Sequence, residues 1–369
     1  MPNHFNLKFS TPVFINFFAS LFSEIKRVMS FSNSKYRPQF LFFIVALKLF
    51  TSAFLPFENN EKSGNSDFLY VSVPSSAPET YAPVFPENAD SVIIPLKKAG
   101  RLFLIEAKVE NQTGNLVFDT GANGLVLNGT YFRDHVRTAG ASTGGITGAV
   151  GKVERISVDK IGFGELTYQK LRADVVSLGH IENRRGVKIL GLVGFSMMKN
   201  LEIVFDAVNS ELKLYKLDDD GNRLSKNPAG LKADHFQKIE GNGNILFLKG
   251  KIAGKTLNFC FDTGAETNTI SSSVNKKILS TLTITRRMEL KGAGSAKSEV
   301  LFGRMNDFSL GEKQITGMET IVTSLFAMSE AYNTQIDGML GYSFLEQGTV
   351  SINFVKKQFG IQFKKGGEK

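Results

Sequence analysis

The tripeptide Asp-Thr-Gly occurs twice in this chain of 369 residues, at 119–121 and at 262–264. Each copy closes a run of apolar residues typical of a buried β-strand, and each is followed by alanine. The two aspartates are 143 residues apart, about the length of a small domain, so the chain has the pattern of one lobe written twice. Two carboxylates delivered in this way predict one shared acid/base centre, formed by Asp119 and Asp262.

The sequence around the two tripeptides is repeated as well. A hairpin-like pair of strands precedes each aspartate, over 103–118 in the first copy and 245–261 in the second. A short apolar segment with paired glycines follows each aspartate at nearly the same distance, at 189–195 and 336–342. After it, each copy has two further apolar runs that predict a hairpin closing its lobe, at 201–215 and 350–363. Matched flanks of this length indicate duplication rather than a chance repeat.

These motifs resemble those of retropepsin-like aspartic peptidases, with both lobes fused into one polypeptide as in the pepsin-like enzymes. The resemblance covers roughly residues 90–365, and it is most specific in the first lobe, over Asp119-Thr-Gly-Ala-Asn-Gly-Leu-Val-Leu127. It implies an all-β fold with short helices, in which two retropepsin-like β-barrel lobes enclose a central cleft. We expect these lobes at 91–220 and 221–369.

The resemblance also implies the activity of an aspartic-type endopeptidase, with Asp119 and Asp262 as the catalytic dyad. Two like charges a few ångströms apart cannot both ionise cheaply, so the pair shares one proton, as is known for aspartic proteases. One carboxylate can then act as the base that activates a water molecule, while the other carboxyl acts as the acid that polarises the scissile carbonyl. This mechanism needs no metal and no other cofactor.

The residues after each aspartate are expected to support the dyad: Thr120, Gly121, Ala122, Thr263, Gly264 and Ala265. By the resemblance, each threonine hydrogen-bonds across the lobe interface, and each glycine lets backbone amides approach the carboxylates. Pepsin-like enzymes commonly carry Ser or Thr at the alanine position, where a hydroxyl donor favours the ionised carboxyl. Because both hydroxyls are absent here, we expect raised pKa values for the dyad and an activity optimum at mildly acidic or neutral pH.

A stretch rich in glycine and small residues, 138–151, lies between the first aspartate and its glycine-pair segment. It lacks the lysine and the spacing of a phosphate-binding loop. It resembles the flap tip of retroviral peptidases, so Gly144, Gly145 and Ile146 are expected to bind an extended substrate by strand addition. The second lobe has a weaker analogue at 291–297, and neither segment carries the tyrosine expected of a pepsin-like flap. Which of the two is the main flap stays open.

The rest of the composition excludes several other classes of protein. The four histidines form no metal-ligand spacing, and the motifs of serine hydrolases and zinc peptidases are absent. Residues 1–57 hold six Lys or Arg and one acid, so most of the net charge of +9 lies there, and no basic stripe with interleaved aromatics predicts nucleic-acid binding. The expected partner is a peptide or protein substrate. Because both lobes lie in one chain, we expect a monomer.

The first 57 residues predict an export signal. Positive charges precede an apolar segment over 40–55, and Lys48 interrupts that segment. A membrane anchor is the alternative, although the segment is short for a spanning helix. Met29 is an alternative start, because 29–57 alone have the length of a signal peptide. Residues 58–90 predict a polar linker or pro-segment, and we expect an exported protein, either secreted or held in the periplasm or cell envelope.

Two other interpretations share this fold. One is a catalytically inactive descendant that binds peptides, since folds outlast their chemistry. Retention of both aspartates, both threonines and both glycines argues against it. The other is a peptidase with a single processing target, which has the same chemistry and differs only in how restricted its substrate pockets are.

Overall fold

The computed structural model describes residues 70–71, 81–145, 148–224, 230–241, 245–291 and 297–365. The expected export signal or anchor at 1–57 lies outside these residues, and so does most of the expected linker at 58–90. Within the described residues, no helix is long and apolar enough to cross a membrane. We call residues 81–224 the first lobe and residues 230–365 the second lobe.

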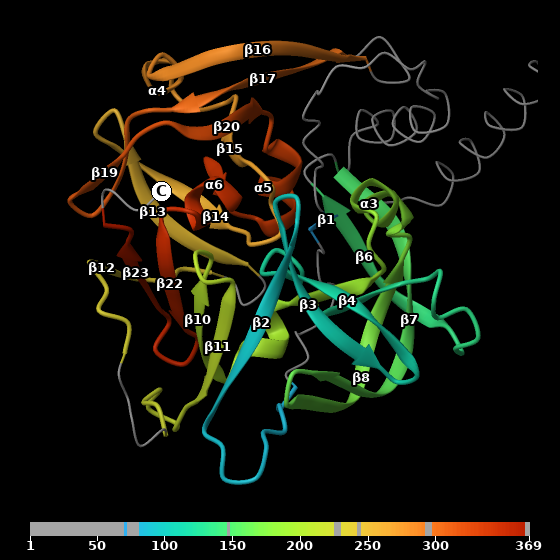
Figure 1. Cartoon of the computed structure of the whole chain (residues 1–369). Coiled ribbons are helices and arrows are strands. Elements are labelled where there is room, and N and C mark those ends of the chain that lie inside the picture. The colour runs from blue at the N-terminus through green and yellow to red at the C-terminus, as the bar shows by residue number, and fades with distance from the viewer. Residues whose placement is uncertain are drawn as a thin grey trace, which may run out of the picture. The chain divides into compact units, whose positions relative to one another are not determined.

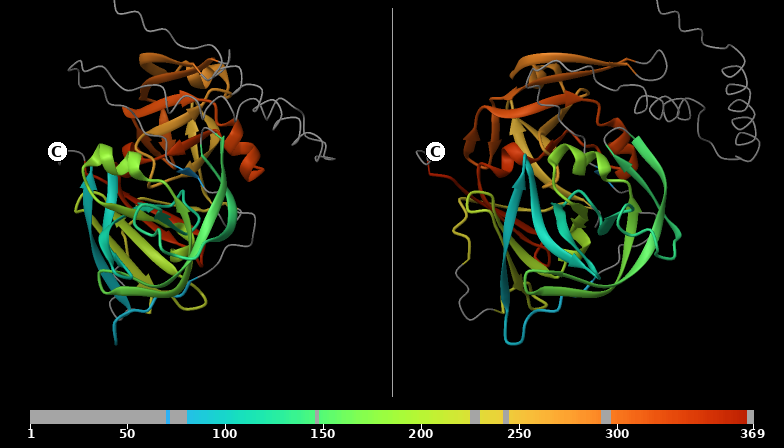
Figure 2. Two further views of the ribbon diagram at one scale, coloured as in Figure 1. Left: turned by 90° about the vertical axis from the view of Figure 1, so that its right-hand side faces the viewer. Right: turned by 45° about the vertical axis from the view of Figure 1, so that its right-hand side comes forward.

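The first lobe is a strongly curled β-structure, because its strands alternate buried and exposed side chains and so present one apolar face inward. Figure 2 shows these cyan and green strands curving around a shared interior. Its strands are β2 (Ser91–Ala99), β3 (Leu102–Val109), β4 (Gln112–Asp119), β5 (Leu125–Asn128), β6 (Thr138–Gly145), β7 (Gly148–Phe163), β8 (Leu166–Val176), β9 (Ile189–Gly194), β10 (Leu201–Asp206) and β11 (Glu211–Lys216). Its short helices are α3 (Gly179–Arg185) and the 3-10 helix η1 (Phe195–Met198).

The second lobe repeats this arrangement with different loop lengths. Its strands are β12 (His235–Lys238), β13 (Leu246–Ile252), β14 (Lys255–Phe261), β15 (Asn268–Ser271), β16 (Leu282–Lys291), β17 (Lys297–Met305), β18 (Phe308–Leu310), β19 (Lys313–Ile315), β20 (Met318–Thr323), β21 (Gly338–Leu340), β22 (Gly348–Asn353) and β23 (Gln358–Phe363). Its helices are α4 (Lys276–Leu279), α5 (Phe326–Tyr332) and α6 (Tyr342–Leu345).

The strand pairing is the same in both lobes. The strand that carries the aspartate pairs in parallel with the glycine-pair strand, as β4 with β9 and as β14 with β21. The strand after the aspartate pairs antiparallel with that same strand, as β5 with β9 and as β15 with β21. On its other side, the strand after the aspartate pairs in parallel with a further strand of its own lobe, as β5 with β8 and as β15 with β20. This repeat confirms the predicted all-β fold of two barrel-like lobes.

The last two apolar runs of each lobe form the predicted hairpins, β10–β11 and β22–β23. We did not expect these hairpins to pair with each other, which they do through β10 and β22, with Val204 opposite Ser351 (Figure 1). The resulting sheet runs β2-β11-β10-β22-β23-β12 and has matching strands on either side of its centre. The physical reason is that a separate hairpin would leave an edge strand with unpaired N–H and C=O groups, which the opposite hairpin satisfies.

Aromatic rings form the base on which the two Asp-Thr-Gly loops rest. Phe118, the residue before the first aspartate, stacks on Phe205 of β10 with ring centroids 5.8 Å apart. Phe261, the residue before the second aspartate, lies edge-on to Phe359 of β23 at 5.7 Å. All four rings belong to one buried core that includes residues of both lobes. Rings packed in this way hold the start of each loop on a stiff support.

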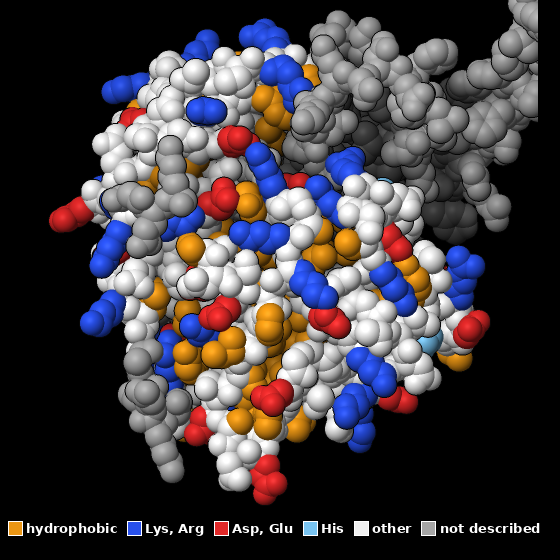
Figure 3. Space-filling view, in the orientation of Figure 1, with side chains coloured by type: hydrophobic (Ala, Val, Ile, Leu, Met, Phe, Trp, Pro, Cys, Tyr) orange, Lys and Arg blue, Asp and Glu red, His pale blue; other side chains and the backbone are white. Residues whose placement is uncertain are grey.

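The charged side chains are mixed on the face seen in Figure 3. Lys and Arg lie among Asp and Glu there, over both lobes, and they do not gather into a stripe.

Candidate active site

The two predicted aspartates meet at the junction of the lobes. Asp119 is the last residue of β4 and Asp262 directly follows β14, so each aspartate lies at the C-terminal end of the equivalent strand of its lobe. A methyl group at Gly264 would lie 2.6 Å from Cγ of Asp119, which places the second loop directly against the first carboxyl. Both side chains are buried, with 0% of Asp119 and 1% of Asp262 exposed. The fold therefore joins two residues that are far apart in sequence into one buried acidic pair.

Four hydrogen bonds between the two threonines and the opposite loops hold the pair together. The Thr120 amide donates to Oγ1 of Thr263 at 2.9 Å, and the Thr263 amide donates to Oγ1 of Thr120 at 3.0 Å. Each hydroxyl then donates to a carbonyl of the other lobe, Thr120 to Phe261 at 3.1 Å and Thr263 to Phe118 at 2.8 Å. Because the bonds are reciprocal and buried, they fix the separation of the two loops.

Backbone amides bind one oxygen of each carboxyl. Oδ1 of Asp119 accepts from Gly121 at 2.8 Å and from Ala122 at 3.2 Å, and Oδ1 of Asp262 accepts from Gly264 at 2.8 Å. Oδ2 of Asp119 is buried and accepts no hydrogen bond from the described residues. A buried carboxyl oxygen without a donor is the favoured place for a proton.

The environment raises the pKa of both carboxyls. Burial is the largest cause for Asp119, followed by the charge of Asp262 and by the hydrogen bond between the two carboxyls, which together hold its pKa well above the ordinary value. Burial also raises the pKa of Asp262, while the hydrogen bond from Asp119 and the amides of Gly264, Ala265 and Gly121 act in the opposite direction. The pair is therefore suited to share one proton.

Both alanines are buried beside the loops. Ala122 packs in a small apolar cluster with Leu102, Leu104, Val117 and others, and Ala265 packs in the matching cluster of the second lobe with Phe247, Cys260, Met328 and others. Neither position supplies a hydroxyl donor to the dyad, which agrees in direction with the raised pKa values.

The glycine-pair segments support the loops from behind, through backbone hydrogen bonds. In the first lobe the Phe195 amide donates to the carbonyl of Ala122 at 3.0 Å, and in the second the Tyr342 amide donates to that of Ala265 at 2.8 Å. The Gly341 amide donates to Oδ1 of Asn268 at 2.8 Å. Asn268 is fully buried, and no motif in the sequence pointed to it.

The two glycine-rich segments lie at the tips of long hairpins. In the first lobe β6 and β7 pair up to Gly145 opposite Gly148, so Gly144 and Gly145 end the strand before the tip, and Ile146 lies outside the described residues. In the second lobe β16 and β17 pair up to Lys291 opposite Lys297. The β6 strand also lies against α5 of the second lobe, which brings the first hairpin to the lobe boundary.

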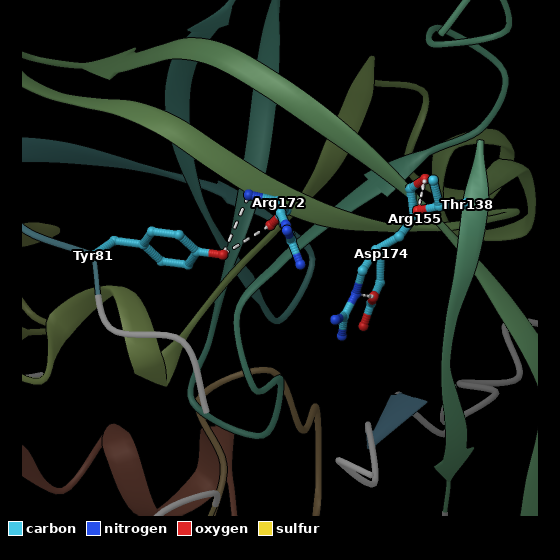
Figure 4. Close-up of polar contacts among 5 residues, drawn as sticks. All are labelled: Tyr81, Thr138, Arg155, Arg172 and Asp174. Atoms are coloured by element: carbon cyan, nitrogen blue, oxygen red, sulfur yellow. Dashed lines mark hydrogen bonds and ion pairs between the residues drawn. The ribbon is translucent and has the colours of Figure 1, made fainter. Parts of the chain in front are cut away.

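Polar side chains brace the base of the first hairpin (Figure 4). Oγ1 of Thr138 on β6 donates to the carbonyl of Arg155 on β7 at 3.3 Å, and Nε of Arg155 donates to Asp174 on β8 at 2.7 Å. The Tyr81 hydroxyl also binds β8, where it accepts from the Arg172 amide at 3.2 Å and donates to the Arg172 carbonyl at 3.4 Å. The base of the hairpin is thus tied across three strands.

A further strand extends the first hairpin at its edge. Residues of β1 (Tyr70–Val71) pair antiparallel with β6, Tyr70 opposite Gly145 and Val71 opposite Gly144. The two glycines expected to bind an extended substrate are therefore paired with an extended segment of this chain.

Several residues around the site escaped the sequence analysis. Arg185 at the end of α3 forms an ion pair with Glu266, three residues after the second threonine, and Arg101 pairs with Glu319 on β20. The buried Tyr332 at the end of α5 packs with Cys260. Only Glu266 carried a signal, because the second loop has an acid where the first has Asn123.

Comparison with protein families gives one match, and it lies in the second lobe. Residues 248–344, which include Asp262, match the family model of aspartyl proteases. A sequence comparison with curated proteins finds no match. Among solved structures, an aspartic proteinase from Irpex lacteus is 15% identical, covering 74% of this chain and 98% of its own, with a TM-score of 0.45. Basic 7S globulin from soybean is 9% identical, covering 75% and 95%, with a TM-score of 0.42.

The family match and the repeated pairing of the lobes lead to one conclusion. This chain has an aspartic peptidase-like fold, and its second lobe matches the aspartyl protease family in sequence.

Proposed function

We propose that this protein is an aspartic endopeptidase, which hydrolyses peptide bonds in extended segments of peptides or proteins. The observation that carries the proposal is the buried pair of Asp119 and Asp262, held at the lobe junction by the reciprocal bonds of Thr120 and Thr263. Burying two carboxyls side by side costs folding free energy, and groups with pKa values perturbed in this way cluster at catalytic sites.

In the proposed mechanism Asp119 begins protonated and Asp262 ionised. Asp262 takes a proton from a bound water molecule while the water oxygen attacks the carbonyl carbon. Asp119 gives its proton to the carbonyl oxygen, and a tetrahedral diol results. Asp262 then passes its proton to the amide nitrogen while Asp119 recovers one from a diol hydroxyl. The C–N bond breaks, a carboxylic acid and an amine leave, and the dyad returns to its starting state. Neither a metal nor a covalent intermediate takes part.

The β6–β7 hairpin is the proposed flap, and strand addition is the proposed way in which the substrate is held. The pairing of Tyr70 and Val71 with Gly145 and Gly144 supports this, because it places an extended chain on the strand edge that a substrate would use. Because both carboxyls are buried, the site has to open before a substrate reaches them, and we propose that the hairpin moves in that step.

A digest of a peptide library tests the proposal. The full chain and its Asp119→Asn variant are incubated with the library, and new termini are identified by mass spectrometry. We expect cleavage at internal bonds by the wild type and by the control Asp159→Asn, which alters an exposed aspartate of β7, but not by Asp119→Asn. If the wild type retains library peptides without cutting them, the inactive peptide-binding interpretation replaces the proposal.

A further inference from the structure

We infer that Arg185 is a positioning residue of the dyad, which acts through Glu266 by fixing the loop of Asp262 against the first lobe. The inference rests on the proposed function and adds a group to it. Arg185 is the last residue of α3 in the first lobe, and Glu266 follows Asp262-Thr-Gly-Ala in the second.

The pair is deeply buried for two charged residues. Its side chains are 15% exposed for Arg185 and 6% for Glu266, and the guanidinium Nη2 contacts Oε1 of the carboxylate. A carboxylate removed from water in this way needs its partner, since removing one member of a buried pair costs far more than replacing both. The loop of Asp262 is therefore tied to the first lobe at a point four residues from the carboxyl that is expected to react.

The β2–β3 turn of the first lobe reinforces the contact. Gly100 has φ +63°, and a methyl group there would lie 2.2 Å from Nη1 of Arg185, so the turn packs directly on the guanidinium. The next residue, Arg101, reaches the same loop, with Nη1 3.5 Å from the carbonyl of Glu266 and 3.5 Å from Oγ1 of Thr267. The turn thus contacts both partners of this junction, because Gly100 packs on Arg185 and Arg101 contacts the segment after Ala265.

The arrangement is one-sided, although the lobes are duplicated. The first loop has the neutral Asn123 at the position of Glu266. The helices α3 and α5 each end before a residue in the left-handed conformation, Gly186 and Asn333. The last residue of α5 is therefore the counterpart of Arg185, but it is Tyr332, which packs inside the second lobe. The duplication alone therefore does not account for the ion pair, and its place beside one loop of the dyad suggests a role in alignment.

A set of four proteins tests the inference: wild type, Arg185→Met, Glu266→Gln and the double variant. In Arg185→Met the unpaired carboxylate displaces the loop, and we expect kcat to fall about 10–100-fold while KM for a cleaved peptide stays within about twofold, because alignment is lost and substrate contacts are not. Glu266→Gln keeps an oxygen that accepts a hydrogen bond from Arg185, so its kcat should fall less than that of Arg185→Met. The double variant should be no slower than Arg185→Met, and Arg184→Met, a change at the exposed neighbour on α3, should match the wild type.

Thermal unfolding of the same four proteins gives a second readout that does not depend on activity. The double variant should unfold no lower than Arg185→Met, since the two changes remove one interaction. Independent losses, in kcat or in unfolding temperature, would overturn the inference, and so would an Arg185→Met enzyme with unchanged kcat. If the wild type cleaves no peptide, the proposed function fails, and the unfolding data alone then decide whether the two residues are coupled.

Discussion

Gly121 lies so close to Asp262 that a methyl group on the glycine would stand 2.6 Å from Oδ2 of that carboxyl. Gly264 has the same relationship to Asp119. Neither glycine has a positive φ, so the requirement at these positions is for space across the lobe junction and not for an unusual backbone. Each glycine of the repeated motif therefore makes room for the aspartate of the other copy.

Alanine at either glycine should consequently disable the dyad. We expect Gly121→Ala to lower the cleavage rate by about 100-fold or more, because the added methyl must push the Asp262 carboxyl out of line. The measurement is kcat on a peptide that the wild type cleaves. The control is Gly179→Ala at the start of α3, where a methyl group meets no atom within 4 Å, so its rate should equal that of the wild type. Equal rates for both variants would contradict the geometry.

The threonine hydroxyls should contribute to stability as well as to alignment. In Thr120→Val the side chain keeps its shape, but the Thr263 amide and the Phe261 carbonyl lose their buried partners. An unsatisfied buried group costs about 1–3 kcal/mol, so the free energy of unfolding should fall by several kcal/mol. Thr120→Ser keeps the hydroxyl and should lose much less in the same denaturant titration. A valine variant as stable as the serine variant would show that these bonds do not hold the lobes together.

The raised pKa values predict how stability changes with pH. In the unfolded chain both carboxyls ionise at about pH 4, whereas the folded protein keeps protons on the pair to higher pH. Between those values the folded state binds more protons, so its stability falls as pH rises through the folded pKa, by about 1.4 kcal/mol per pH unit for each proton. The contribution is fully present below the unfolded pKa.

Asp119→Asn should remove part of this dependence. With one raised carboxyl fewer, its free energy of unfolding should fall less steeply with pH than that of the wild type, whereas Asp159→Asn should keep the wild-type slope. Denaturant titrations at several pH values measure this. Parallel curves for the wild type and Asp119→Asn would mean that Asp119 takes up no proton on folding.

The alanines after the glycines give a prediction for activity. The wild-type rate should peak at mildly acidic or neutral pH, and Ala122→Ser should move the whole profile to lower pH, because a hydroxyl donor favours the ionised form of Asp119. Ala99→Ser makes the same change in the same apolar cluster without adding a donor after the glycine, and its profile should stay in place. A wild-type profile that peaks below about pH 3 would contradict the role assigned to the alanines.

The sequence predicts the strands that are specified by local patterns and that occur in both copies of the repeat. The strands before Asp119 and Asp262 and the glycine-pair segments are short apolar runs bounded by turns, which is the pattern that specifies a buried strand. The pairing of β10 with β22 could not be predicted, because an alternating strand shows which face is buried but not which edge it joins.

The helices and charges of the site were missed for related reasons. The helices α3 and α5 have seven residues each, too few for a period of 3.6 to be distinct. Arg185 and Glu266 are 81 residues apart, and nothing in the neighbourhood of either residue shows that the fold brings them together. The repeated motif located the dyad, and the contacts that align it come from long-range packing.

The central claim is tested most directly by the cleavage rate of Asp119→Asn and Asp262→Asn on one defined peptide, measured at the wild-type optimum on protein shown to be folded by its unfolding transition. Each variant removes one proton-transfer group, so we predict that both rates fall by about 10²–10⁴-fold or more. A rate within tenfold of the wild type for either folded variant would contradict the account, because the chemistry would then not depend on the pair.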